Sequence, residues 1–327
     1  MRKISYGAAG LEALAEEMRR DEKIFHLSTD APGALLKEFG PSRVRATPIA
    51  ESALTGMAIG AAGSGFRPIV DWRLVTFSFV AMDQIVNQAA KIHYMFGGQA
   101  TFPILFRTTV GGGTRRAAQH SQSPYSMFMH LSGLKMIIPS TAYDLKGLLK
   151  TAIRDNNPVI SFECGRIDNV LGEVPEPDDD YAIPLGVADI KRAGTDVTVV
   201  ALAWMVPEAL AAAAILAGEG ISVEVVDPRT LVPMDADAIR GSVQKTGRLV
   251  IADEAVPTAG ASAEIAALVT EHRATFEALK APVKRVCGLP VPVPYAPHLE
   301  DFVFPDRHRI ADGVREVLGL EEAVARV

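Results

Sequence analysis

The order of apolar and polar positions predicts helices and strands that follow one another along the first half of the chain. Apolar residues recur at helical spacing in Gly7–Arg20, Glu51–Ala62 and Phe79–Phe96, which is typical of helices that pack on a core along one face. Short apolar runs predict strands at Ile24–Leu27, Arg67–Asp71, Pro103–Arg107, Lys135–Ile138 and Val159–Phe162. Strands that alternate with helices need crossover connections, so we expect a mostly parallel sheet covered on both faces.

Residues that favour helix ends agree with this pattern. Gly63 and Gly65 follow the second predicted helix, and glycine tolerates the left-handed conformation common at a helix C-terminus. A further helix is expected before Val159, opened by Ser140 or Thr141, with Asp144 placed for a capping interaction.

The composition changes between residues 173 and 186, which begin with EVPEPDDD. This acidic, proline-rich sequence suits a solvated linker. Beyond it the alternation resumes, with strands predicted at Asp196–Ala203, Ile221–Val226 and Arg248–Asp253 and helices at Val206–Ala217, Asp235–Lys245 and Ala261–Arg273. Since 327 residues exceed the usual size of one core, we predict two α/β domains, residues 1–172 and 187–327, joined by the linker.

Composition and charge narrow the class of protein. Hydrophobic residues make up 48% and charged residues 22% of the chain, enough to bury a large core. The formal charge of −6 disfavours nucleic acid or an anionic membrane as the main partner. Cys164 and Cys287 are far apart and lack metal-ligand spacing, and the N-terminus has no apolar signal region. We therefore expect a cytosolic protein with neither disulfides nor membrane spans.

Two loops that follow predicted strands carry candidate chemistry, because parallel sheets place ligand sites at the carboxyl ends of their strands. The first is TPIAE, which ends with Glu51 at the start of a helix. This carboxylate either stabilises the helix N-terminus through its dipole or has a chemical role.

The second loop, Val110–Ser123, contains three glycines, two arginines and His120 among small polar residues. It is either a flexible surface loop or a functional one. It matches neither the phosphate-binding Walker loop nor the dinucleotide-binding fingerprint. From the residues alone, the chain is an enzyme-like α/β protein with a candidate carboxylate, a candidate histidine and a glycine loop.

Motifs that span nearly the whole chain carry a specific resemblance. In chain order they are TPIAE (47–51), TFSF (76–79), DQIVNQAAK (83–91), GGG (111–113), AQHSQS (118–123), GLK (133–135), KGLLKTAIRDNNPV (146–159), VEVVDPRTLVPMD (223–235) and KTGRLVIADE (245–254). With them the chain resembles the β subunit of the thiamine-diphosphate-dependent decarboxylating component of 2-oxo acid dehydrogenases, the family of pyruvate, branched-chain 2-oxo acid and acetoin dehydrogenases. The resemblance implies a transketolase-like fold, with a pyrimidine-binding domain and a transketolase C-terminal-like domain.

The resemblance also implies roles for individual residues. Glu51 would hydrogen-bond the aminopyrimidine of thiamine diphosphate and promote the tautomer that acts as a base. Ile49, Arg73 and Phe77 would line the same ring, with Phe77 packed against it. His120 would act near the reacting carbons, in proton transfer or in stabilising intermediates.

Metal ions and partner chains are implied in the same way. The family's structural potassium site, built mainly from main-chain oxygens, maps to Ile104, Ala152, Ile153, Asp155 and Asn157. The Gly-Asp-Gly motif that holds Mg²⁺ and the diphosphate is missing here, so a separate α subunit is expected to supply it. The expected assembly is an α₂β₂ heterotetramer with β–β contacts. It would decarboxylate a 2-oxo acid or cleave acetoin and pass the acyl group to the lipoyl arm of an acyltransferase.

The chain departs from the family pattern at two places. Thr29 stands where a glutamate normally lies near the cofactor, in a loop that is shorter than usual, and the family often has an apolar residue in place of Arg73. The Ser28–Asp30 sequence slightly favours the C-terminal half of a split transketolase-type enzyme, whereas HSQS and the helix that begins near Asp83 favour the dehydrogenase.

The sequence disfavours two functions outside thiamine-dependent catalysis. A non-catalytic scaffolding subunit is disfavoured because Glu51 and His120 are both present. A nucleotide-binding α/β protein is disfavoured because both glycine fingerprints are missing. The choice among 2-oxo acids is left open, since the partner chain would line much of the substrate pocket.

Overall fold

A computed structural model describes residues 1–177 and 179–320. The chain forms two compact units, the first from Met1–Val110 and Met127–Leu185, the second from Gly111–Ser126 and the chain from Gly186 onward. The Gly111–Ser126 loop therefore belongs by its contacts to the second unit, although the sequence division places it within residues 1–172.

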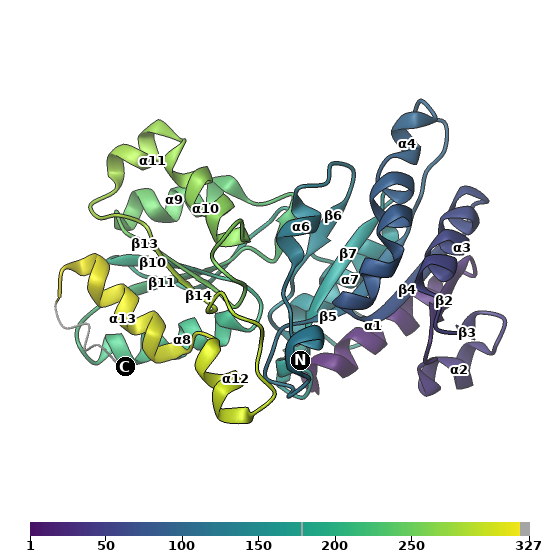
Figure 1. Cartoon of the computed structure of the whole chain (residues 1–327), viewed down its shortest axis with the longest axis horizontal. Coiled ribbons are helices and arrows are strands. Elements are labelled where there is room, and N and C mark those ends of the chain that lie inside the picture. Colours follow the sequence, from purple (N-terminus) through teal and green to yellow (C-terminus); the bar gives the residue numbers. More distant parts are fainter. Residues whose placement is uncertain (178, 321–327) are drawn as a thin grey trace. The chain divides into compact units, whose positions relative to one another are not determined.

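The first unit is built on a parallel sheet (Figure 1). Its strands lie in the order β6 (Lys135–Ile137), β7 (Val159–Cys164), β5 (Leu105–Val110), β4 (Arg67–Leu74), β2 (Ile24–Ser28) and β3 (Val44–Ala46). Each neighbouring pair among them is parallel. All the strands predicted for the first half of the chain are confirmed, with shifted ends.

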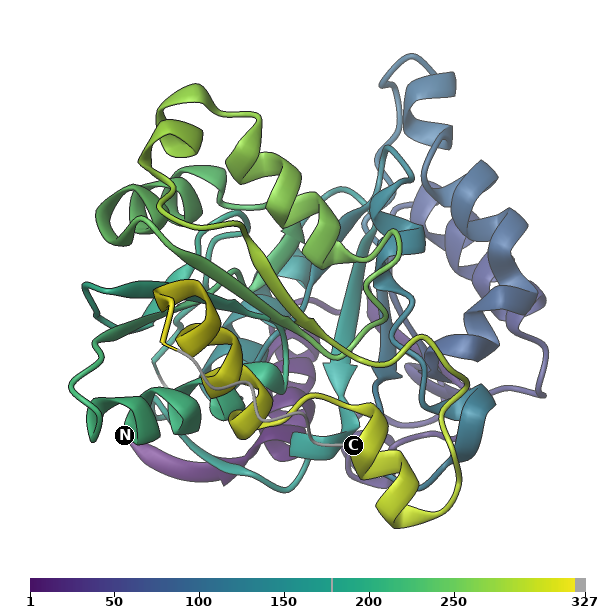
Figure 2. The same cartoon turned by 60° about the vertical axis from the view of Figure 1, so that its left-hand side comes forward.

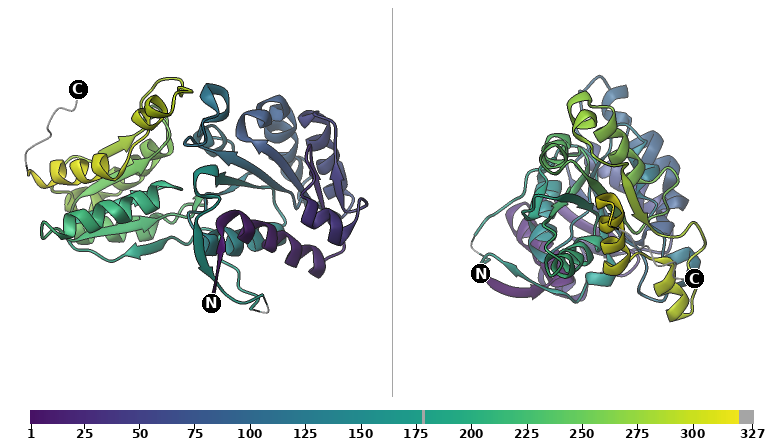
Figure 3. Two further views of the ribbon diagram at one scale, coloured as in Figure 1. Left: turned by 90° about the horizontal axis from the view of Figure 1, so that it is seen from below. Right: turned by 90° about the vertical axis from the view of Figure 1, so that its left-hand side faces the viewer.

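Helices cover both faces of this sheet. On one face α1 (Tyr6–Arg20) lies alongside α7 (Ala142–Arg154), as Figures 1 and 3 show. The opposite face carries α3 (Glu51–Gly63), which packs on β4. Successive side chains of a strand point to opposite faces of the sheet. Trp72 and Phe106 accordingly stack at 4.6 Å on the α3 side, whereas Arg107, the next residue, approaches Gly10 of α1. Smaller elements are α2 (Gly33–Phe39) and the antiparallel pair β1 (Arg2–Ser5) and β8 (Leu171–Val174).

The expected cap of α7 is confirmed at Thr141, whose hydroxyl accepts a hydrogen bond from the Asp144 N–H at 3.0 Å. That cap satisfies one of the backbone donors left free at a helix N-terminus.

The single helix predicted for Phe79–Phe96 is wrong. The chain forms a 3₁₀ helix at Val75–Ala81, a π-helical turn at Gln84–Ala89 and a short α4 (Ile92–Met95). The wide turn is visible in the Ala90 N–H, which donates to the Ile85 carbonyl at 3.0 Å. Apolar spacing reveals a buried face but not the width of the turn, so it cannot separate these forms.

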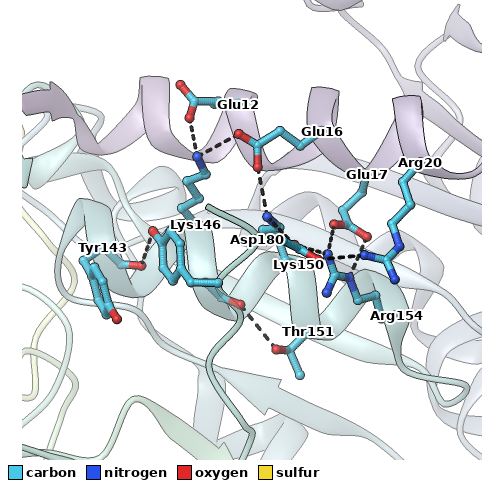
Figure 4. Close-up of polar contacts among 12 residues, drawn as sticks. Glu12, Glu16, Glu17, Arg20, Tyr143, Lys146, Lys150, Thr151, Arg154 and Asp180 are labelled. Carbon is cyan, nitrogen blue, oxygen red and sulfur yellow. Dashed lines mark hydrogen bonds and ion pairs between the residues drawn. The ribbon is translucent and has the colours of Figure 1, made fainter. Parts of the chain in front are cut away.

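Ion pairs join α1 to α7 in the first unit (Figure 4). They connect Lys146 with Glu12 and Glu16, Lys150 with Glu16, and Arg154 with Glu17. Both lysine side chains are buried beneath the Tyr181 ring, with their ammonium groups near its face.

The linker was expected to be solvated, and the structure corrects this at both of its ends. Glu173 and Val174 belong to β8, where Val174 is buried, and the residues after the acidic run pack on α7. Tyr181 stacks on Tyr143 of α7 at 4.7 Å, and the Thr151 hydroxyl donates to the Ile183 carbonyl at 2.7 Å. Asp180 accepts hydrogen bonds from Arg154 and Lys150, which hold the pKa of its carboxyl well below the usual range. Charge and proline content suggested solvent, but the aromatic and apolar residues after the acidic run provide packing.

The second unit has its own mostly parallel sheet, in the order β14 (Lys284–Cys287), β13 (Leu249–Asp253), β10 (Val197–Ala201), β11 (Val223–Asp227) and antiparallel β9 (Asp189–Arg192). One face carries α8 (Met205–Ala217) and α13 (Arg307–Leu318), the other α9 (Ala236–Thr246), α10 (Ala261–Thr270) and α11 (Arg273–Ala278), as Figure 2 shows. The α8 and α13 side buries a continuous apolar core against the strands. The predicted architecture of two α/β domains with mostly parallel sheets is confirmed.

Within the described residues, no helix combines the length and apolar character needed to cross a bilayer.

Candidate active site

Glu51 is the first residue of α3 and follows the TPIA loop. Its residue surface is only 6% exposed, yet its carboxylate forms no hydrogen bond or ion pair within residues 1–177 and 179–320. Buried carboxylates are normally paired. A carboxylate that served only the helix dipole would be expected in solvent, as Glu264 is in the first turn of α10. Glu51 is thus largely buried as a residue, while its carboxylate is left unpaired, which fits an external hydrogen-bond partner such as a ring nitrogen.

The other expected pyrimidine contacts lie at the same edge of the first sheet, where β3 and β4 end. Phe77 lies half-buried in the 3₁₀ helix that follows β4. Ile49 is 84% exposed in the loop before Glu51. The Ser52 hydroxyl donates to the Val80 carbonyl at 2.5 Å and so holds exposed Val80 beside the start of α3. Large apolar side chains exposed around a buried carboxylate are typical of a surface that binds a ligand or a partner.

Arg73 lies near the end of β4 with a left-handed backbone, at φ 68°. Its N–H donates to the Asp71 carboxylate at 2.8 Å, and its guanidinium is 3.7 Å from the Asp30 carboxylate. The two departures from the family pattern, Arg73 and the Ser28–Asp30 loop, are thus neighbours at the carboxyl edge of the sheet. The Arg73–Asp30 ion pair therefore lies next to Thr29, the residue that stands where the resemblance leads us to expect a glutamate.

His120 ends α5 (Ala117–His120), a single turn in the second unit, and is half-buried. Glu51 belongs to the first unit. The two residues predicted to be catalytic are therefore carried by different units of the chain.

The segment after His120 is tied to the end of β13. The Ser123 hydroxyl donates to Glu254 at 2.8 Å, and the Tyr125 hydroxyl donates to Asp253. Burial raises the pKa of the Asp253 carboxyl, and burial together with Asp253 raises the pKa of Tyr125 well above its ordinary value. A hollow of about 380 Å³ adjoins this segment, lined by Gln119, Ser121, Ser123, Glu254, Leu289 and Phe304 among others. The loop considered either flexible or functional is held in place by buried polar groups.

The expected potassium ligands do not form a free oxygen cage. Arg67 donates from Nη1 to the carbonyls of Ile153 at 3.0 Å and Asp155 at 3.1 Å. The Asp155 carboxylate binds Lys135 and the Asn157 amide. Because the positive charge of the guanidinium already lies against two of the carbonyls proposed for the ion, a second cation there would be repelled, and these residues do not fit a bound potassium ion.

No cluster of three or more metal-ligating His, Cys, Asp or Glu side chains occurs among the described residues.

Sequence patterns did not indicate that charged side chains of the first sheet would be buried together. Arg107 forms a bidentate ion pair with Glu163, at 2.8 and 2.7 Å, and Asp71 lies 4.0 Å away. His26, on β2, is fully buried, and burial lowers its pKa to about 4, an effect that Asp71 opposes and Arg107 and Arg73 reinforce. The signal available in the sequence was polar residues inside predicted parallel strands, which are otherwise apolar.

Comparison with known families defines the class of protein. Residues 2–164 match the family described as "Transketolase, pyrimidine binding domain", and residues 186–310 match "Transketolase, C-terminal domain". A solved structure described as a split gene transketolase, in an inactive β4 tetramer, superposes with a TM-score of 0.80 and 26% sequence identity. It covers 98% of this chain, which covers 99% of it.

Relatives with higher sequence identity narrow the family. The chain is 45% identical to the β subunit of the acetoin:2,6-dichlorophenolindophenol oxidoreductase of Bacillus subtilis, over 97% of this chain and 98% of that protein. It is 44% identical to the pyruvate dehydrogenase E1 β subunit of Rickettsia felis (94% and 95% covered) and 41% identical to the 2-oxoisovalerate dehydrogenase β subunit of B. subtilis (96% and 98%). The chain belongs to this family of thiamine-dependent oxidoreductase β subunits.

Proposed function

We propose that this chain is the β subunit of the decarboxylating component of a 2-oxo acid or acetoin dehydrogenase and is active only with an α subunit. The observation that carries the proposal is the nearly buried Glu51 carboxylate, which has no partner within residues 1–177 and 179–320. A whole-length match to dehydrogenase β subunits at 41–45% identity supports it.

The chain's own residues would bind one half of the cofactor. Glu51 would share a proton with a ring nitrogen of the aminopyrimidine, while Phe77, Ile49 and Arg73 contact the ring. Bound thiamine diphosphate would supply the electron sink for cleavage of the bond next to the substrate carbonyl. His120 would move a proton near the reacting carbons, a role that suits imidazole near neutral pH.

Partners complete the proposal. An α subunit would hold the diphosphate and Mg²⁺, because the Gly-Asp-Gly motif is missing from this sequence. The exposed apolar side chains of Ile49 and Val80 at the sheet edge support a covering partner there. An α₂β₂ assembly with β–β contacts, transfer to a lipoyl acyltransferase and a cytosolic location remain parts of the proposal. A structural potassium ion is left out because of Arg67.

A split transketolase-type enzyme is the second candidate, and the fold match supports it. Identity of 26% to that structure, against 45% to the acetoin enzyme subunit, favours the dehydrogenase.

The test is coexpression with an α subunit that carries Gly-Asp-Gly, followed by assay with pyruvate, 2-oxoisovalerate and acetoin. We expect one of them to drive reduction of 2,6-dichlorophenolindophenol, with no turnover by either subunit alone. Ketol transfer between sugar phosphates in place of this reaction would identify a split transketolase and overturn the proposal.

A further inference from the structure

The loop that carries His120 is bound by a buried carboxylate that lies far away in the sequence. Glu300 lies in α12 (Pro297–Val303) of the second unit and is completely buried. One carboxylate oxygen accepts the Gly113 N–H at 2.8 Å, and the other accepts Arg115 Nη1 at 2.7 Å. A single side chain therefore fixes both the backbone and a side chain of the loop. We call the contacts of Glu300 with Gly113 and Arg115 the clasp.

Arg115 extends this contact along α12. Its two terminal nitrogens bind the Asp301 carboxylate, each at 2.9 Å, and Nη1 also donates to the Pro297 carbonyl at 2.9 Å. Hydrogen bonds to Asp301 and Glu300 raise the pKa of Arg115. The planar guanidinium suits such multiple, directional contacts better than a lysine would.

The backbone between the clasp and His120 adopts conformations that need support. Arg115 and Ala117 have left-handed φ angles of 58° and 59°, which are unfavourable for residues with a Cβ. A Cβ on Gly112 would lie 2.0 Å from the Phe304 ring, so the loop is also closely packed from below. Strained backbone persists where surrounding contacts determine it, and here the determining contacts come from α12.

The clasp lies immediately before the turn that presents the histidine. Arg115 lies two residues before the start of α5, and His120 is the last residue of that helix. On the far side, Ser123 is bound to Glu254. His120 is thus held between two anchors that both belong to the second unit.

We propose that Arg115 and Glu300 are positioning residues that hold the His120 imidazole in its reactive place. This inference deepens the proposed function and rests on it for the role of His120. It assigns part of the catalytic geometry to α12, an element that contains no predicted catalytic residue. Misplacement of a reacting group by about 1 Å can cost about 100-fold in rate, so loss of the clasp should impair turnover without removing any catalytic group.

The first experiment measures loop order in the full chain, assembled with its α partner, by hydrogen exchange of peptides that cover residues 111–124. Glu300→Gln keeps the size of the side chain and the acceptor for Gly113 but loses the ion pair. We expect exchange in this loop to become at least about tenfold faster. The matched control is Glu208→Gln, because Glu208 is also buried and forms an ion pair of the same length, 2.7 Å, with Arg307 of α13, away from the loop. That control should leave loop exchange unchanged.

The second experiment measures whether the effect passes through His120. Glu300→Gln should lower kcat about 10- to 100-fold with little change in KM. Combined with His120→Ala, it should cause no further loss, because there is no longer an imidazole to position. Glu208→Gln should leave kcat near the wild-type value.

The outcomes separate the two claims. Unchanged loop exchange in Glu300→Gln, or a full additional loss of kcat in the double variant, would overturn the positioning role. An equal loss of kcat in Glu208→Gln would do so too, since general destabilisation would then explain the effect. A wild-type assembly that shows no dehydrogenase reaction would contradict the proposed function, while the exchange measurement would still decide whether the clasp orders the loop.

Discussion

The indole Nε1–H of Trp72 donates to the hydroxyl of Thr55 at 2.9 Å, and both side chains are buried. Trp72 belongs to β4, and Thr55 lies one helical turn after Glu51 in α3. The bond fixes the rotation of α3 against the sheet, and with it the direction in which the first turn presents its carboxylate. Stacking of Trp72 on Phe106 holds the indole from its other side.

Replacement of that carboxylate tests its chemical role. Glu51→Gln should lower kcat by about two to four orders of magnitude, because an amide cannot share a proton with the aminopyrimidine. The assembly with the α subunit should remain intact by size-exclusion chromatography. Glu264→Gln is the control, since it removes a solvent-exposed first-turn carboxylate from α10 and costs only the dipole interaction. Full activity in Glu51→Gln would show that this side chain serves the helix alone.

The buried His26 should make stability fall in mild acid. Burial lowers the imidazole pKa to about 4 from 6.5, so between these pH values the unfolded chain binds a proton that the folded chain does not. Stability is therefore present above pH 6.5 and declines as the pH falls towards 4, by about 3 kcal/mol in total. Urea unfolding of the wild type across this range measures the decline.

His26→Leu should lack that part of the pH dependence. Neither imidazole nitrogen of His26 bonds to another described residue, so leucine removes the titration without breaking a hydrogen bond. The exposed His308 provides the control, because His308→Gln should preserve the wild-type slope. Parallel curves for wild type and His26→Leu would refute the assignment.

Replacement of Gly147 by alanine tests the packing of the linker on α7. Alanine normally stabilises a helix interior by up to about 1 kcal/mol over glycine. Here its Cβ would lie 2.6 Å from an Ile183 side-chain carbon and 2.9 Å from the Tyr181 ring. We expect Gly147→Ala to cost about 1–3 kcal/mol and to expose the linker to proteolysis.

Gly241, in α9, supplies the comparison for that substitution. A Cβ there meets no atom within 4 Å, so Gly241→Ala should raise the melting temperature slightly. If both alanine variants were stabilised alike, the linker would not be packed as described.

The contacts of Arg67 with two carbonyls of the expected potassium site lead us to predict that folding does not depend on potassium. A resident ion present at 100 times its Kd would add about 2.7 kcal/mol to stability. With the guanidinium on the Ile153 and Asp155 carbonyls, the melting temperature should be the same in potassium, sodium and choline chloride. Arg67→Gln frees both carbonyls and should create a potassium-dependent increase. A potassium effect in the wild type would restore the ion to the site.

The sequence was sufficient for the features that depend on local pattern. The strands predicted in the two sheets, α1, α3 and the Thr141 cap follow from apolar spacing and end signals, whereas short strands such as β3 and β14 were not predicted. Glu51 was found because it begins a predicted helix directly after a proline-containing loop, a position that can be read without knowing the fold. The resemblance then supplied its chemical role.

Features that depend on distant partners were not accessible in this way. Nothing near Glu300 connects it with Gly113, from which it is separated by 187 positions, and the Arg67 contacts with the end of α7 are equally remote. The π-helical turn before Ala90 has the same apolar spacing as an α-helix. The acidic composition around Asp180 gave no indication that Arg154 and Lys150 would bind its carboxylate.

The Gly111–Ser126 insertion into the second unit has a consequence for how such chains recombine. A chimera of two relatives joined at residue 185 would take the loop from one parent and its seat, formed by Asp253, Glu254 and Glu300, from the other. Compatible exchange would instead need junctions near residues 110, 126 and 185. We therefore expect relatives to change the loop and the residues that bind it together, although the two lie far apart in the sequence.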